Sequence, residues 1–74
     1  MPTLVRFANF EIDIYFEDHN PPHVHVVGRD FEVLVAIRDG VVLAGEAPAR
    51  AQRTAMQWIA NNRAMLLARW DEYH

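Results

Sequence analysis

The chain of 74 residues contains no cysteine and no lysine, and it has only three glycines. The absence of cysteine excludes disulfides, thiolate nucleophiles and cysteine-based zinc sites, and it fits a reducing compartment. No apolar run approaches the roughly 18 residues that a membrane-spanning helix needs. The first six residues also lack the charged and apolar regions of a signal peptide. We therefore expect a cytoplasmic protein without a membrane segment.

Positive charge is also scarce. Seven arginines stand against ten acidic residues, which gives a net charge of −3. This balance argues against a nonspecific nucleic-acid coat, because such coats are basic. It leaves room for a local RNA site that needs only a few well-placed cations. With 51% hydrophobic residues the composition is that of a globular protein, and the length suits a single domain over residues 1–74.

The hydrophobic pattern changes near Ala47-Pro48, from a period of two to a helical period. Short turn signals such as Asp39-Gly40 divide the first part, residues 3–45, into strands. The expected strands cover residues 4–8, 11–16, 23–27, 31–37 and 41–44. Residues 41–44 fit either an edge strand or an internal strand. Sequential strands joined by short turns predict an antiparallel sheet of four or five strands.

The second part, residues 48–73, consists of good helix formers behind Pro48. One apolar stripe runs along it through Ala55, Ile59, Leu66, Trp70 and Tyr73. A single helix of this length would measure about 37 Å, which exceeds the roughly 30 Å expected for a chain of this size. We expect either a break near Asn61-Asn62 or one long helix whose end projects. The fold class is therefore α+β, with a C-terminal helix or two consecutive helices on one face of the sheet.

The alternation also predicts which side chains share the other face of the sheet. That face should carry the ionisable residues Glu11, Asp13, Tyr15, His23, His25, Glu32 and Arg38. Directly paired residues of antiparallel strands lie on the same face, and a slip of one residue would bury the histidines. Amphipathicity therefore favours a register in which Tyr15 pairs with His23 and Asp13 with His25. We expect these four side chains to meet on an open sheet surface.

Three of the four histidines lie in one segment, His19-Asn20-Pro21-Pro22-His23-Val24-His25-Val26. Imidazole titrates near neutrality and also binds metal ions, so three interpretations stay open. In one, His19, His23 and His25 hold zinc or a similar ion, with Glu17, Asp18 or Asp13 as an oxygen ligand. In another, the prolines merely stiffen a turn, with or without a cis bond, and the histidines are ordinary strand and loop residues.

The third interpretation is acid–base catalysis on RNA without a metal or cofactor. One histidine would take the proton of a 2′-hydroxyl, another would protonate the leaving oxygen, and an arginine would stabilise the charge on phosphorus. Arg38 is expected on the histidine face, whereas Arg6 reaches it in only one of two registers. Tyr15 and Asp13 would orient the imidazoles. The candidate catalytic residues are His19, His23, His25, Arg6, Arg38, Tyr15 and Asp13.

These motifs resemble a family of small bacterial proteins known as domain of unknown function 4160. The resemblance rests on the histidine segment, and also on Met1-Pro2-Thr3 with Arg6, Tyr15-Phe16, Asn62-Arg63, Leu66-Leu67, Trp70 and Glu72-Tyr73. It covers nearly the whole chain. Many relatives have a Lys/Glu-rich helical region, whereas this chain is rich in Ala and Arg there.

The resemblance implies a two-protein function. Members commonly lie beside a gene for a second small protein, of the family called domain of unknown function 2442, in what looks like a type II toxin–antitoxin module. We therefore expect a toxin that acts on RNA or translation and that a small protein antitoxin neutralises. The acid–base interpretation of the histidines, and not the resemblance, adds the hypothesis of a metal-independent endoribonuclease. A noncatalytic protein-binding adaptor or regulator and a small histidine-based metal-binding protein are the alternatives.

Overall fold

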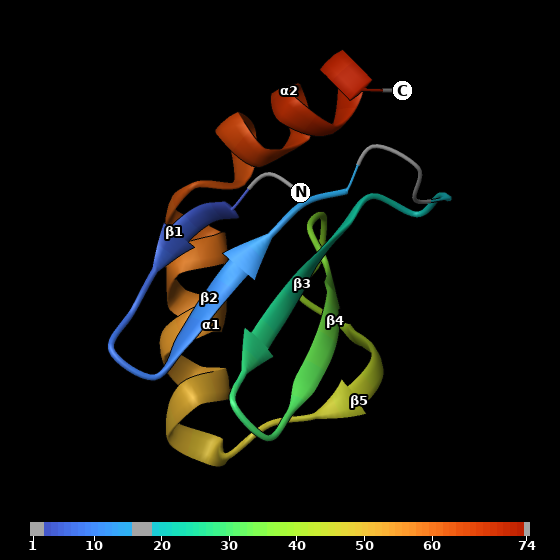
Figure 1. Ribbon diagram of the computed structural model, residues 1–74. Helices are drawn as coiled ribbons and strands as arrows, with labels where there is room; N and C mark the ends of the chain where they lie inside the picture. The colour runs from blue at the N-terminus through green and yellow to red at the C-terminus, as the bar shows by residue number, and fades with distance from the viewer. Residues whose placement is uncertain (1–2, 16–18, 74) are drawn as a thin grey trace.

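The computed structural model describes residues 3–15 and 19–73. Five strands form one antiparallel sheet in chain order, and two helices follow it. The elements are β1 (Thr3–Arg6), β2 (Phe10–Asp13), β3 (His23–Gly28), β4 (Glu32–Ala36), β5 (Val42–Glu46), α1 (Ala49–Asn61) and α2 (Arg63–Tyr73). The predicted α+β fold is confirmed. In Figure 1, α1 runs behind the sheet and α2 crosses its upper end.

The register between β2 and β3 decides which side chains meet on each face. Asp13 pairs with His25, as the alternation predicts, and Ile12 pairs with Val26 on the opposite face. The second predicted pair, Tyr15 with His23, does not belong to the ladder, because β2 ends at Asp13. Phe16, the last residue of the predicted strand, lies outside the described residues.

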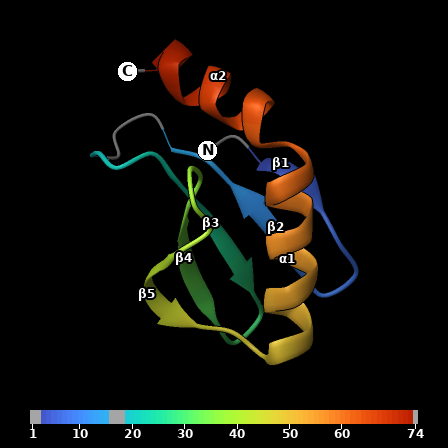
Figure 2. The same cartoon turned by 180° about the vertical axis from the view of Figure 1, so that it is seen from behind.

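The core lies between the sheet and the helices. The buried apolar side chains of β2, β3 and β4 pack against Ala55 and Ile59 of α1 and against Leu66 and Trp70 of α2. Each of these four helix residues is at most 2% exposed, so the predicted apolar stripe is confirmed for them. Figure 2 shows α1 lying along this face. Neither helix of the described chain is long and apolar enough to cross a membrane.

The helical region breaks at Asn62, which confirms the first of the two expectations for it. The Asn62 side chain donates a hydrogen bond to the Trp58 carbonyl at 2.8 Å, and the backbone carbonyl of Asn62 accepts one from the Leu66 amide at 2.9 Å. Asn62 thus interrupts the helical region between the end of α1 at Asn61 and the start of α2 at Arg63. Arg63 Nε then donates to the Ile37 carbonyl at 2.6 Å, which ties the start of α2 to the end of the sheet.

Strand β5 is an edge strand, which settles the alternatives for this segment. Every residue of β5 is exposed, and the pairing with β4 is irregular between Leu34 and Val35. Gly45 has a φ of 83°, a conformation that favours glycine. The exposed large apolar side chains include Val41 and Leu43, at 51% and 42% exposure. Bulges and irregular backbone of this kind blunt a sheet edge against unwanted strand pairing.

Candidate functional site

A row of paired residues crosses the sheet on the face away from α1. Thr3 of β1 pairs with Asp13, Asp13 with His25, and His25 with Leu34 of β4. Directly paired side chains share a face, so the ladder itself assembles these groups. We call the set Asp13, Tyr15, His23, His25 and Glu32 the histidine surface.

His25 and Glu32 form the closest polar pair of the histidine surface. His25 Nδ1 lies 2.8 Å from Glu32 Oε2, and the two side chains are 12% and 50% exposed. An ionised carboxylate only accepts hydrogen bonds, so Nδ1 is the donor, and a neutral ring then carries its lone pair on Nε2. The ring of Tyr15 meets His25 edge-on at a centroid distance of 4.3 Å. An imidazole oriented by a carboxylate is suited to act as a general base.

His23 is buried, so the prediction of an open surface is wrong for this residue. It is 8% exposed, and its ring lies 5.4 Å from the Trp70 ring and 5.3 Å from the His25 ring. Its Nδ1 donates to the Pro21 carbonyl at 2.8 Å. The physical reason is the path of α2, which crosses the end of the sheet and brings Trp70 against the first residue of β3. His23 therefore has a structural role in joining α2 to the sheet.

Asp13 is also buried, although it lies on the face away from α1. It is 1% exposed, and neither carboxylate oxygen has a hydrogen-bond partner among the described residues. Burial raises the pKa of the Asp13 carboxyl, and the neighbouring Glu11 raises it further, whereas Thr3 and His25 act in the opposite direction. An unpaired buried carboxylate destabilises a fold. The sheet face that the sequence predicts to be open is therefore inaccessible to solvent at Asp13.

We expect Asp13→Asn to stabilise the protein at neutral pH. The folded-state pKa of Asp13 is raised, so protonation favours the fold, and this stabilisation is lost as pH rises from the unfolded pKa near 3.9 through the folded pKa. Each unit of elevation corresponds to about 1.4 kcal/mol. Urea unfolding between pH 4 and 7 should give a flatter pH dependence for Asp13→Asn than for wild type. The exposed Asp71→Asn is the control, and equal slopes for both variants would refute the interpretation.

The two candidate arginines lie in different places. Arg6 pairs with Glu11 across the β1–β2 ladder, which puts it on the face of the histidine surface. Its Nε lies 3.7 Å from Glu11 Oε1, and its side chain is 77% exposed. Arg38 is exposed in the turn after β4 and forms no hydrogen bond or ion pair with the rest of the described chain. Only Arg6 is therefore held on this face by strand pairing.

The third histidine of the segment stands apart. His19 is exposed, and no interaction joins it to another described residue. The Asn20-Pro21 bond that follows it is cis. Glu17 and Asp18, named as oxygen ligands for a metal, lie outside the described residues. Within residues 3–15 and 19–73, no group of three or more His, Asp or Glu side chains is placed to hold a metal ion.

Comparison with known proteins identifies the family. A family model matches residues 9–71, which include the whole histidine surface, and its description is "Domain of unknown function (DUF4160)". The chain belongs to the DUF4160 family. The comparison with curated proteins found no match, and neither did the comparison with solved structures. The function of this DUF4160 chain must therefore be argued from the geometry of its site.

Sequence reasoning about this DUF4160 chain overlooked two contributors to the site. The alternation predicts the correct face for Glu32 but assigns it no role, although Glu32 is the partner of His25. The turn at residues 28–30 carried the signal, because it pairs Val27 with Glu32 and so brings Glu32 diagonally beside His25. Trp70 gave no such signal, because its contact with His23 depends on the angle between α1 and α2.

Proposed function

We propose that this chain is the toxin of a two-protein module and that its histidine surface cleaves RNA by acid–base chemistry. The observation that carries the proposal is the His25–Glu32 hydrogen bond of 2.8 Å. It orients the imidazole by fixing Nδ1 as the hydrogen-bond donor, and it stabilises the imidazolium that forms when the ring takes up a proton.

In the proposed reaction, His25 Nε2 removes the proton of a 2′-hydroxyl. The 2′-oxygen attacks the adjacent phosphorus, the bond to the 5′-oxygen breaks, and a 2′,3′-cyclic phosphate remains. The departing 5′-oxygen takes up a proton from water, and the imidazolium of His25 returns its proton to solvent. Arg6, which is exposed on the same face, balances the negative charge that develops on the phosphoryl oxygens.

A second observation favours protein binding. Val41, Val42 and Leu43 are consecutive and exposed at 51%, 36% and 42%, beside the irregular edge of the sheet. Consecutive exposed apolar side chains are typical of contact surfaces. The small protein antitoxin is expected to cover this segment. If the chain has no catalytic activity, the same surface supports the alternative function of a protein-binding adaptor.

The test is induced expression of the wild-type chain in a bacterium, together with an assay of the purified protein. We expect growth to arrest, and we expect the purified chain to cleave single-stranded RNA in the presence of a chelator and to leave 2′,3′-cyclic phosphate ends. Co-expression of the neighbouring small protein should restore growth. Normal growth with abundant folded protein would refute the toxin function, and loss of cleavage in chelator would refute the metal-independent chemistry.

A further inference from the structure

The sheet face of the histidine surface continues into a hollow at the opposite end of β2 and β3. The hollow measures about 300 Å³, and its walls include Arg6, Asn9, Glu11, Val27 and Arg29. Glu11 and Val27 form the pair next to Asp13–His25 on the same face of the ladder. Two residues along a strand cover about 7 Å, so the hollow lies one side-chain row from His25.

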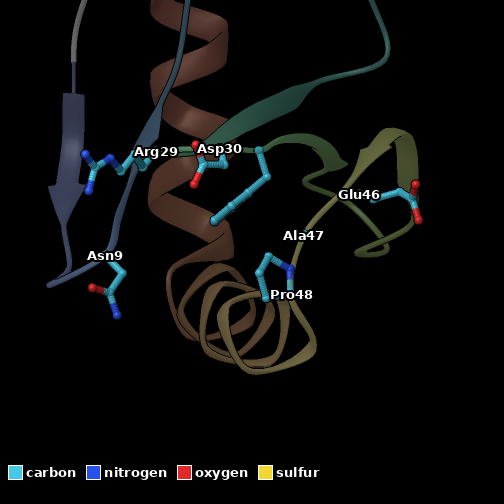
Figure 3. A pocket seen from close by; sticks show the side chains of 7 residues that line it. Asn9, Arg29, Asp30, Glu46, Ala47 and Pro48 are labelled. Carbon is cyan, nitrogen blue, oxygen red and sulfur yellow. The ribbon is translucent and has the colours of Figure 1, made fainter.

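Two guanidinium groups converge on this hollow from different elements. Arg6 comes from β1, and Arg29 comes from the turn between β3 and β4. Figure 3 looks into the adjacent depression, of about 490 Å³, and shows the Arg29 side chain directed toward β1 and away from Glu46. Arg29 is exposed and forms no ion pair with any described side chain.

The one carboxylate in the wall of the hollow is already paired, whereas Asp30 and Glu46 line the adjacent depression, so Arg29 is the guanidinium of the hollow without an ion-pair partner among the described residues. Glu11, the one carboxylate in its wall, is paired with Arg6. Glu32 is hydrogen-bonded to His25, and Asp13 is buried. Two guanidinium groups and the Asn9 amide offer several N–H donors in planar arrangements, which suit the oxygens of a phosphate.

We propose that this hollow binds a backbone phosphate of single-stranded RNA, next to the nucleotide that reaches His25. The proposal rests on the proposed RNA chemistry and adds the phosphate subsite that sets the position of the strand. A phosphate contact fixes the register of a strand without reading its sequence. Arg29 is therefore a positioning residue, and the expected substrate preference is for single strands of any sequence.

The test measures binding of a fluorescent 2′-O-methyl oligonucleotide, which lacks the 2′-hydroxyl and stays uncleaved, over a range of salt concentrations. Arg29→Ala should weaken binding about tenfold at low salt. It should also make the slope of log affinity against log salt less steep by about 0.7, the value for one lost phosphate contact on a single strand. Arg29→Lys should keep the slope and recover part of the affinity. Arg53→Ala is the matched control, because Arg53 is exposed on α1 and lines a different hollow.

The outcomes separate the phosphate subsite from the chemistry. Equal binding by Arg29→Ala and Arg53→Ala, or no salt-dependent binding by wild type, would overturn the subsite. Competition by inorganic phosphate as strong as that by the oligonucleotide would also overturn it, because the site would then take a free anion instead of a strand. Oligonucleotide binding with the expected slope, but without cleavage of ordinary RNA, would support the subsite and refute only the proposed catalysis. If Arg29→Ala cleaves RNA at the wild-type rate, the proposed catalysis is supported and the phosphate subsite is refuted.

Discussion

His25→Ala is expected to lower the rate of single-turnover RNA cleavage by about 10²–10⁴-fold, the usual contribution of a general base. The variant removes the ring that Glu32 holds at 2.8 Å, and alanine offers no group that accepts a proton. Growth arrest on induced expression should disappear with it. The fold should persist, because the strand pairing of His25 is made by the backbone.

Two further variants make this result specific. Glu32→Gln keeps the size of the side chain but removes the charge that orients Nδ1–H, so we expect an intermediate loss of rate. Glu72→Gln makes the same chemical change on the exposed surface of α2 and should leave the rate unchanged. A folded His25→Ala variant that cleaves RNA as fast as wild type would contradict the proposed chemistry. His23→Ala is a poor probe, because loss of the ring contact with Trp70 also disturbs the packing of α2.

Gly45→Ala is expected to have the largest effect on folding. Gly45 has a φ of 83°, and a Cβ placed there would clash with the backbone carbonyl oxygen of Glu32. The clash is with backbone, so β5 must move away from β4. Backbone strain and the clash together should lower the free energy of unfolding by about 3 kcal/mol or more. A domain of this length is stabilised by only roughly 4–11 kcal/mol.

Gly40→Ala is the control that separates the clash from the strain. Gly40 has a similar φ of 73°, but the nearest atoms to its added Cβ are 3.9 and 4.0 Å away. Its cost is therefore conformational, about 1–2 kcal/mol. Urea unfolding followed by circular dichroism should rank wild type above Gly40→Ala, and Gly40→Ala well above Gly45→Ala. Equal destabilisation by the two substitutions would mean that β5 yields easily.

The sequence predicted those parts of the fold that depend on local pattern. Alternating apolar and polar residues fixed the register of Asp13 against His25, because a slip would have exposed the aliphatic face. The break at Asn62 was predictable because a continuous helix would have been longer than the domain and because asparagine suits a helix terminus. The same alternation placed Glu32 on the face of His25.

The sequence did not predict what depends on the path of α2 and on side chains from several strands. His23 is buried because Trp70, 47 positions later in the chain, reaches the start of β3. That contact follows from the angle between the helices, which Arg63 helps to fix through the Ile37 carbonyl. The burial of Asp13 likewise depends on neighbours from β1, β2 and β3 together. It could not be predicted from the sequence of any one of these strands.

The contact between Trp70 and His23 gives the protein an internal optical probe. Indole emission depends on the groups that surround the ring, and the Trp70 and His23 rings are 5.4 Å apart. The emission of Trp70 therefore reports on whether α2 is seated against the sheet. The second indole, Trp58 on α1, can be replaced by phenylalanine to remove its background. Displacement of α2 from the sheet can then be followed in real time without an attached dye.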